Sequence, residues 1–566
     1  MLRRFRRHDI RMVQDLRGVW DFAFLGDVDP DDANISEIAF DDRMAVPGSF
    51  DATPKYAGHR GLAAYRTYAY VRDASPHRLV LDGVHHWARV FAGGRKIRDH
   101  VGGFTRFDCD IAADRAGEIE ILVLVDNRID YERCPLHLDY FDWYHFGGIT
   151  RGAELHRLGS TWIDAVVITT EDVAARRLAL KITCRSMAAS DAVPLSIHVG
   201  DRPVLEEKVA VASGETVIER GIELTGAALW SPREPRLHEI AVRLGTDDVR
   251  ERVGIRQVRV DGRKILVNGE PVRLLGFNRH EIHPHFGHGL PDAVNVIDVQ
   301  QLLDMNCNFV RGSHYPQDVR FLDLCDEAGL CVWCEPTAWQ PTAEHLTDEK
   351  FLEAQLNVAS EMVASAVNHP SVVMWGALNE GHSDDEKAKA GYAKVLNLLK
   401  GADPTRPVTY ATCRPFKDVC YDLADIISVN CYPGWYGASI DEIPAAIDKI
   451  VAHVDASGQG DKPLIISEIG AGAIYGWRDW NETRWSEQYQ VKLLETVIRH
   501  LFVDRDRFAG LSIWLYGDFR TSQQTGRALG RPRAFNNKGV VDEYRRPKMG
   551  YEVVKRMFGE LSPPPR

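Results

Sequence analysis

The feature that most constrains the fold is an alternation of short apolar strands and amphipathic helices from about residue 261 onwards. The strands are runs of bulky apolar residues, as expected for parallel strands that are buried on both faces. We predict strands at 273–277, 307–312, 329–334, 372–378, 407–412, 426–430, 464–468 and 510–515. The predicted helices span 296–303, 320–327, 351–367, 386–399, 440–454, 487–501 and 548–558.

Eight strands in about 300 residues predict a closed (β/α)8 TIM barrel. A doubly wound sheet is the alternative, but no glycine-rich phosphate loop follows any of the strands. The barrel is assigned to residues 259–566.

The sequence before the barrel reads as all-β. Residues 1–160 contain alternating or aromatic-rich runs between Gly, Pro and Asp turns, which predicts a jelly-roll-like β-sandwich. Residues 161–258 largely alternate with period two, and about a hundred residues of this pattern predict an immunoglobulin-like β-sandwich. The predicted fold class is therefore multidomain, β followed by α/β.

Charge and composition limit the partners of the chain. A net charge of −12 and a pI near 6.0 argue against nucleic acid. No apolar stretch approaches the roughly 18 residues that span a bilayer, and no apolar region follows the basic N-terminus. The ten cysteines lie in reduced, apolar surroundings, so we expect a cytoplasmic protein without a membrane partner. Cys331 and Cys334 have metal-type spacing but lie inside one apolar strand, and we expect no metal there.

Polar and aromatic residues follow the ends of the predicted barrel strands, where barrel enzymes place their active sites. Aromatic faces suit the C–H faces of sugars, and carboxylates suit their hydroxyls. The residues at these ends are Asn278, His280, Glu281, Ser313, His314, Tyr315, Glu335, Asn379, Glu380, Asn430, Tyr432, Trp435, Tyr436, Glu468, Trp514 and Asp518.

Two of these carboxylates end apolar strands of the same kind. Glu380 follows the fourth strand, and Glu468 ends the seventh. Glycoside hydrolysis needs one carboxyl group that protonates the leaving oxygen and one that attacks the anomeric carbon. We predict that Glu380 and Glu468 form this pair. In the alternative, Glu335 or Asp518 does this work and one of the pair only hydrogen-bonds a loop.

Longer motifs resemble glycoside hydrolase family 2 over nearly the whole chain, and within it the β-glucuronidase branch. They are Val46-Pro-Gly-Ser-Phe50, Val101-Gly-Gly-Phe-Thr105, Asp142-Trp-Tyr-His-Phe-Gly-Gly-Ile-Thr-Arg151, Gly276-Phe-Asn-Arg-His-Glu281, Arg311-Gly-Ser-His-Tyr-Pro316, His369-Pro-Ser-Val-Val-Met-Trp375 with Asn379-Glu380, and Lys462-Pro-Leu-Ile-Ile-Ser-Glu468. The resemblance implies a retaining mechanism without metal or cofactor. Glu380 is then the general acid/base and Glu468 the nucleophile, with carboxyl groups about 5–5.5 Å apart.

The resemblance also implies roles for residues around the pair. Asn379 would bind the sugar 2-hydroxyl, and Tyr432 would orient the nucleophile. His280, His314 and Trp514, at strand ends, are expected to complete the substrate-binding surface. Because family members are often dimers or tetramers, we expect a homo-oligomer.

The sugar is indicated by Asn536 and Lys538, which match the Asn-x-Lys motif that β-glucuronidases use for the C6 carboxylate. An amide and an ammonium that converge on a carboxylate form charge-assisted hydrogen bonds. Tyr436 matches a second position that contacts the uronate, and Asp142 matches a carboxylate that the first domain sends into the barrel cleft. By itself, the 536–539 segment is also good turn chemistry.

The predicted reaction is therefore release of terminal β-linked glucuronic acid from a small-molecule or oligosaccharide β-uronide. A β-galacturonidase, which differs only in the C4 configuration of the sugar, is the nearest alternative. A family 2 β-galactosidase acting on neutral sugars and a catalytically inactive sugar-binding protein remain further alternatives.

Three departures from the family pattern stand out. Gly381 replaces the usual proline after Glu380. The segment 520–535 is long and rich in arginine (Arg520, Arg527, Arg531 and Arg533), which suggests an acidic aglycone or oligosaccharide without indicating which arginine contacts it. The loop His283-Pro-His-Phe-Gly-His288 holds three histidines, for which we expect loop packing or substrate contact, with a metal site as the alternative.

Overall fold

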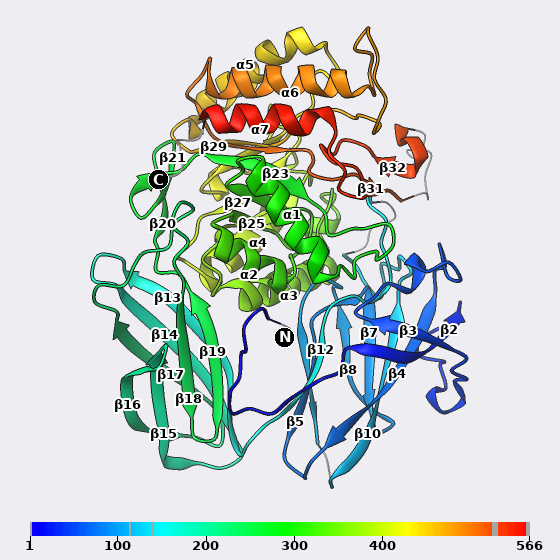
Figure 1. Cartoon of the computed structure of the whole chain (residues 1–566), viewed down its shortest axis with the longest axis vertical. Coiled ribbons are helices and arrows are strands. Elements are labelled where there is room, and N and C mark those ends of the chain that lie inside the picture. The colour runs from blue at the N-terminus through cyan, green and yellow to red at the C-terminus, as the bar shows by residue number, and fades with distance from the viewer. Residues whose placement is uncertain (1–2, 113–114, 137–140, 523–529, 562–566) are drawn as a thin grey trace.

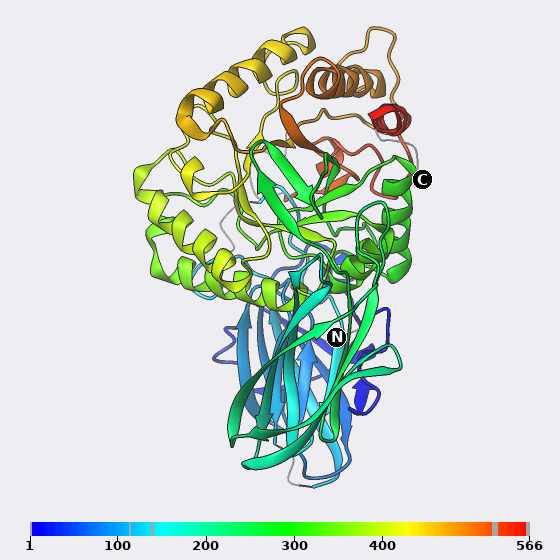
Figure 2. The same ribbon diagram turned by 90° about the vertical axis from the view of Figure 1, so that its left-hand side faces the viewer.

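The computed structural model describes residues 3–112, 115–136, 141–522 and 530–561. A barrel surrounded by helices rests on two β-sandwiches that stand side by side beneath it (Figure 1). In the view turned by 90° the two sandwiches overlap and the barrel still caps one end of both (Figure 2). The predicted fold class, with β-sandwiches before a C-terminal TIM barrel, is confirmed.

The first sandwich consists of a four-stranded and a six-stranded sheet. The four-stranded sheet has the order β1 (Val13–Asp15), β12 (Ala153–Arg157), β5 (His77–Leu81), β9 (Phe107–Ile111). The six-stranded sheet has the order β3 (Asp42–Val46), β2 (Gly18–Gly26), β4 (Leu62–Val71), β10 (Gly117–Asp126), β7 (Trp87–Ala92), β8 (Arg95–Val101). A short ladder joins β6 (Val84–His85) and β11 (Gly148–Ile149). Trp20, Phe22 and Tyr65 fill the core between the sheets.

The second sandwich packs a three-stranded sheet on a four-stranded one. Their orders are β13 (Thr161–Asp172), β14 (Arg177–Ser186), β17 (Gly214–Glu223) and β16 (Arg202–Val211), β15 (Ser190–Val199), β18 (His238–Leu244), β19 (Asp247–Val253). Alternate residues of β14 are buried, as period-two patterning requires. The small sheet β20 (Val258–Asp261), β21 (Lys264–Val267), β22 (Glu270–Pro271) leads into the barrel.

Eight parallel strands close the barrel. They are β23 (Leu274–Arg279), β24 (Phe309–Gly312), β25 (Cys331–Cys334), β26 (Val372–Asn379), β27 (Val408–Thr412), β28 (Ile427–Asn430), β29 (Leu464–Glu468) and β30 (Phe508–Ile513). β30 pairs with β23, with Leu274 opposite Gly510, which closes the ring. All eight residues of β26 are buried. This burial explains why the strand is apolar along its length and why a polar residue first becomes accessible at its end.

Helices surround the barrel as the apolar periodicity predicts. They are α1 (Asp292–Asp304), α2 (Val319–Ala328), α3 (Glu349–Ala366), α4 (Glu386–Ala402), α5 (Ile443–Val454), α6 (Glu487–Phe502) and α7 (Met549–Leu561). Between β27 and β28 the chain forms only the short 3₁₀ turn η4 (Tyr421–Leu423). None of the helices that the structure describes has the length and apolar character needed to cross a membrane.

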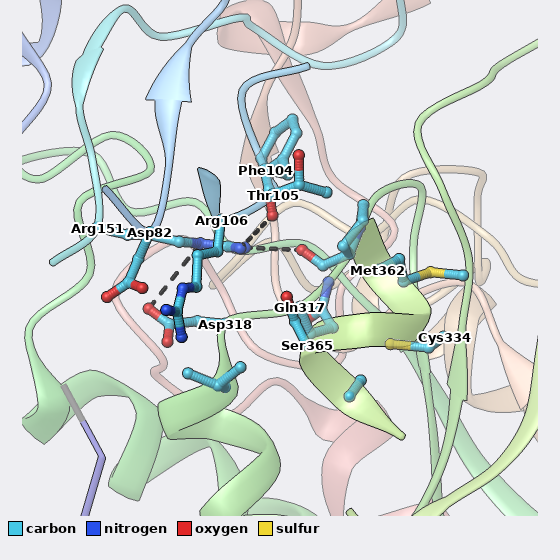
Figure 3. Close-up of a pocket in the computed structure, with 13 residues that line it drawn as sticks. Asp82, Phe104, Thr105, Arg106, Arg151, Gln317, Asp318, Cys334, Met362 and Ser365 are labelled. Atoms are coloured by element: carbon cyan, nitrogen blue, oxygen red, sulfur yellow. Dashed lines mark hydrogen bonds and ion pairs between the residues drawn. The ribbon is translucent and has the colours of Figure 1, made fainter. Parts of the chain in front are cut away.

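A buried arginine joins the first sandwich to the barrel. Arg151 Nη2 donates to Glu281 Oε2 and to the Pro316 carbonyl, both at 2.7 Å, and Nη1 bonds the Phe104 carbonyl. Figure 3 shows Arg151 reaching between Phe104 and Asp318. The neighbouring cavity is only about 20 Å³, room for about one water molecule, so it is a packing gap at a domain junction and cannot hold a sugar.

Candidate active site

A cavity of about 620 Å³ lies at the C-terminal ends of the barrel strands, a volume typical of a small-ligand pocket. Nine of the eleven residues predicted for the site line it: Asp142, His314, Glu380, Tyr432, Tyr436, Glu468, Trp514, Asn536 and Lys538. Its other lining residues are Trp143, Trp339, Gln340, Cys413, Trp435, Arg484, Trp485, Gly530 and Arg531. The first sandwich contributes Asp142 and Trp143, so the pocket is built from both parts of the chain.

Glu468 ends β29 and is held from two directions. Arg311 Nη1 donates to its Oε1 at 2.9 Å, and Tyr432 Oη donates to its Oε2 at 2.6 Å. Burial, followed by the charge of Glu380, raises the pKa of Glu468 to about 8, while Arg311 and Tyr432 act in the opposite direction. These contacts fix the carboxylate in one orientation at the floor of the pocket.

Glu380 follows β26 in a left-handed backbone conformation, with φ of 52°. This region is unfavourable for a residue with a Cβ and recurs at functional sites. Gln340 Nε2 donates to Glu380 Oε2 at 2.8 Å, and Asn430 Nδ2 donates to Oε1 at 2.9 Å. Glu380 is only partly buried, so its carboxyl group reaches the open part of the pocket.

The two carboxyl groups differ in their hydrogen-bond donors. Glu468 accepts bonds from a guanidinium and a phenol, which favour its ionised form. Among the described side chains, the donors to Glu380 are the neutral amides of Gln340 and Asn430. The charge of Glu380 adds to burial in raising the pKa of Glu468, so the two carboxyl groups are electrostatically coupled.

Asn379 and His280 are not among the residues that line the cavity. The Asn379 side-chain oxygen accepts bonds from Arg311 at 2.8 Å and Asn430 at 3.0 Å, whereas its Nδ2 has no hydrogen-bond partner among the described residues. His280 is buried behind the pocket wall, where its ring lies 5.5 Å from that of Trp514 and 4.2 Å from that of Phe519. We therefore assign His280 to packing behind the substrate-binding surface, where it supports Trp514.

The predicted carboxylate-binding end of the pocket contains a dense polar network. Lys538 Nζ lies 2.9 Å from Tyr436 Oη. Arg531 forms a two-pronged ion pair with Asp142, with N···O distances of 3.0 and 2.9 Å, and Asn536 Nδ2 donates to the same carboxylate at 2.8 Å. Arg531 is thus neutralised by Asp142, whereas Lys538 has no carboxylate within ion-pair distance in the described part of the chain.

Lys538 is 2 % exposed, and burial lowers its pKa. A buried ammonium without an acidic partner is costly and favours the binding of an anion. The pocket therefore offers a cationic hydrogen-bond donor, and it does so at the end that also holds Tyr436, Arg531 and Asn536.

The alternative acids, Glu335 and Asp518, lie outside the cavity lining and have ion-pair partners there. Glu335 accepts two bonds from Arg311, at 3.0 and 2.9 Å, and one contact from His314 Nδ1 at 2.9 Å. Asp518 pairs with Lys548 at 2.8 Å, and both side chains are fully buried. Neither Glu335 nor Asp518 lines the pocket, so this geometry favours Glu380 and Glu468.

The arginines of 520–535 serve different purposes. Of the described arginines in this segment, Arg531 is the one that lines the pocket. Arg533 pairs with Glu543, and Arg520 stacks on Tyr144 with its Cζ 4.1 Å from the ring centre. Arg527 lies outside the described residues. The expectation that this segment presents free positive charge to an aglycone is therefore not supported by the three described arginines.

The Cys331–Cys334 spacing motif and the histidine loop 283–288 both take part in packing. Cys331 and Cys334 belong to different hydrophobic clusters, and burial raises the pKa of each thiol to about 12. In the histidine loop, His283 stacks on Phe286, and the Nδ1 atom of His288 lies 2.8 Å from the Glu281 carbonyl oxygen.

Two residues that contact Glu468 and Glu380 were not predicted as site residues from the sequence. Arg311 lies inside β24 and contacts Glu335, Asn379 and Glu468. A charge in the middle of an apolar strand was the available signal, because a buried charge needs partners. Gln340 gave no such signal, since its position depends on a loop after β25 whose Trp339 forms a bridge with Asn379.

A barrel with two glutamates at strand ends and aromatic walls defines the glycoside hydrolase class of protein. Residues 258–562 match the model "Glycosyl hydrolases family 2, TIM barrel domain", and residues 161–256 match "Glycosyl hydrolases family 2". The chain therefore belongs to glycosyl hydrolases family 2.

Relatives of known structure and sequence cover almost the whole chain. A Paenibacillus borealis β-glucuronidase is 29% identical over 97% of each chain. A GH2 β-galacturonidase from Eisenbergiella tayi, bound to galacturonate, is 33% identical with a TM-score of 0.92 and covers 99% of this chain and 100% of its own. A Bifidobacterium dentium β-glucuronidase, complexed with coumarin-3-O-glucuronide, is 27% identical with a TM-score of 0.89 over 99% and 98%.

Proposed function

We propose that the protein is a retaining exo-β-uronidase that releases terminal β-linked glucuronic acid. The observation that carries the proposal is the buried ammonium of Lys538, which lines the pocket and has no acidic partner among the described residues. The C6 carboxylate of a uronate would neutralise it, with Tyr436 and Asn536 as neighbouring polar groups. A neutral sugar would leave this charge buried and unpaired.

In the proposed mechanism Glu380 donates its proton to the glycosidic oxygen while Glu468 attacks C1. The C1–O bond to the leaving group breaks, the aglycone departs as an alcohol, and a glycosyl ester forms on Glu468. Glu380, now ionised, takes a proton from water, whose oxygen attacks C1 and releases the ester. Retention follows from two inversions at C1.

The surroundings of the pair suit these steps. Arg311 contacts both Glu468 and Glu335. When Glu468 becomes an uncharged ester, the guanidinium of Arg311 therefore retains Glu335 as an acidic partner. Asn379 Nδ2, which has no partner among the described groups, is a donor that could bind the sugar 2-hydroxyl after a small movement. Trp143, Trp339 and Trp514 provide apolar walls for the ring.

A second candidate is hydrolysis of β-galacturonides. It is favoured by the likeness to the Eisenbergiella tayi β-galacturonidase, at 33% identity and a TM-score of 0.92. The two uronates differ only at C4, and the Asp142–Arg531 pair is a candidate contact for that hydroxyl.

Parallel assays of aryl β-glucuronide, β-galacturonide and β-galactoside test the proposal. We expect kcat/KM for the glucuronide to exceed kcat/KM for the galactoside by at least about 100-fold, because the galactoside lacks the carboxylate that forms a buried, charged hydrogen bond. A preference for galacturonide would select the second candidate. Inactivity on both uronides would refute the proposed function.

A further inference from the structure

A second cavity, of about 710 Å³, continues from the catalytic pocket. The two cavities share Cys413, Tyr432 and Tyr436. The second cavity is bounded by the segments after β27 and β28 and by α5, with Arg414, Phe416, Lys417 and Lys449 among its lining residues. It can therefore hold a group that is covalently joined to a sugar in the first cavity.

This second cavity lies on the side of the proposed acid. Arg414 Nη1 donates to the backbone carbonyls of Glu380 and Gly381, at 3.0 and 3.1 Å. Asn430, which donates to the Glu380 carboxylate, also lines it. Because the acid protonates the glycosidic oxygen, the leaving group must lie on the acid's side of the scissile bond. The second cavity is thus placed to receive the aglycone.

The charges of this cavity favour an anion. It contains three cationic side chains, Arg414, Lys417 and Lys449, and two acids, Asp384 and Glu442. Asp384 pairs with Arg414 at 3.0 Å, and Glu442 accepts two bonds from Ser439 at the start of the α5 region. Lys417 and Lys449 are exposed and form no ion pair with any described residue. In a chain of net charge −12, such local positive charge matters for an anionic substrate.

Its apolar surface suits a sugar ring. Phe416 is 52 % exposed, and Pro415, Pro433 and Ile450 lie beside it in the lining. The exposed ring of Phe416 lines the same cavity as the ammonium groups of Lys417 and Lys449, a combination that matches a sugar ring with an apolar C–H face and a carboxylate.

We propose that this cavity is an aglycone subsite for an acidic sugar, so that the preferred substrate is a β-uronoside whose leaving group is itself a uronate. The inference rests on the proposed uronidase function and specifies its leaving group. The positive charge for such an aglycone lies in the segment after β27 and on α5, and not on the described arginines of 520–535.

The test compares a β-uronosyl-uronate disaccharide with the β-uronosyl-hexose of the same linkage, whose second sugar is neutral. An aryl β-uronide serves as a substrate that lacks the second sugar. The variant is Lys417→Glu/Lys449→Glu, and the control is Lys394→Glu, an exposed lysine of α4 that lines neither cavity. Retained aryl uronide hydrolysis demonstrates that the variants are folded.

We expect wild-type kcat/KM to be about 5- to 10-fold higher for the acidic disaccharide than for the neutral one at low ionic strength. This is the size of effect expected when two exposed ammonium groups, Lys417 and Lys449, attract one carboxylate. The double variant should lose this preference and leave aryl uronide hydrolysis within about 2-fold, while Lys394→Glu changes neither. Equal wild-type rates on the two disaccharides, or equal losses in the double variant, overturn the subsite while leaving the uronidase function intact. Absence of aryl uronide hydrolysis in the wild type refutes the uronidase function itself.

Discussion

Replacement of Lys538 by methionine tests the recognition of the sugar carboxylate. Lys538 is 2 % exposed, and its Nζ lies 2.9 Å from Tyr436 Oη. A carboxylate bound at about 3 Å from this ammonium therefore interacts with it in a largely desolvated site. At an effective dielectric constant of about 20, two unit charges at this distance attract by about 5 kcal/mol. Truncating one partner of a buried charge pair costs about 2–5 kcal/mol.

That range corresponds to a fall in kcat/KM for the preferred uronide of about 30- to 5,000-fold. Hydrolysis of a neutral aryl β-galactoside should change by less than about 3-fold or improve slightly, because the variant removes a buried charge that a neutral sugar cannot pair. Both rates are measured on the same preparations, with Lys555→Met, an exposed lysine paired with Asp304, as the matched control. Equal losses on uronide and galactoside, or a uronide loss below 3-fold, would show that Lys538 does not bind the carboxylate.

Three further predictions concern the catalytic pair and the domain junction. Glu380→Gln should lower kcat about 100- to 10,000-fold for alkyl uronides and much less for nitrophenyl uronides, which need little protonation on leaving; equal losses would argue against an acid role. Because the pKa of Glu468 is raised to about 8, kcat/KM should fall above about pH 8, where the pair of glutamates loses its proton. Between about pH 4.5 and 8 the folded state keeps this proton while the unfolded chain loses it, so the folded state should become less stable as pH rises through this window. Glu468→Gln should abolish turnover and flatten the dependence of Tm on pH, and a parallel slope in both proteins would contradict this. Arg151→Met should cost about 1.5–3 kcal/mol of unfolding free energy in denaturant titration, since it removes a buried charged hydrogen bond to Glu281 while Arg279 remains as a partner, whereas Arg17→Met, an exposed pair with Asp15, should cost less than about 1 kcal/mol.

The barrel was predictable because its strands are buried on both faces. β26 and β29 show this most clearly, since every residue of each is buried, and a glutamate directly follows β26 (Glu380) and ends β29 (Glu468). Strand starts were less accurate: the third strand begins at Cys331 and not at residue 329, because Gly329 takes a left-handed conformation that ends α2. The domain limits at residues 160 and 258 stay predictions.

The gathering of residues around the pocket was predictable where a residue belongs to a strand end or a short motif, as Glu380, Glu468 and Lys538 do, while their roles stay predictions. It was not predictable where the position depends on a long-range partner. Arg531 meets Asp142 across 389 residues of sequence, and the arginine composition of its segment could not distinguish this buried pair from free positive charge. Gln340 likewise reaches Glu380 only through the path of its loop.

The proposed double-displacement mechanism requires Glu468 to become covalently attached to the sugar during turnover. Incubation with a 2-deoxy-2-fluoro-β-uronosyl fluoride, followed by peptide mass spectrometry, tests it most directly, because the fluorine at C2 slows hydrolysis of the ester. We expect one fluorouronosyl group per chain, located on Glu468 within the peptide that contains β29. An adduct on Glu335 or Glu380, or turnover of natural uronide that inverts the anomeric centre, would contradict it.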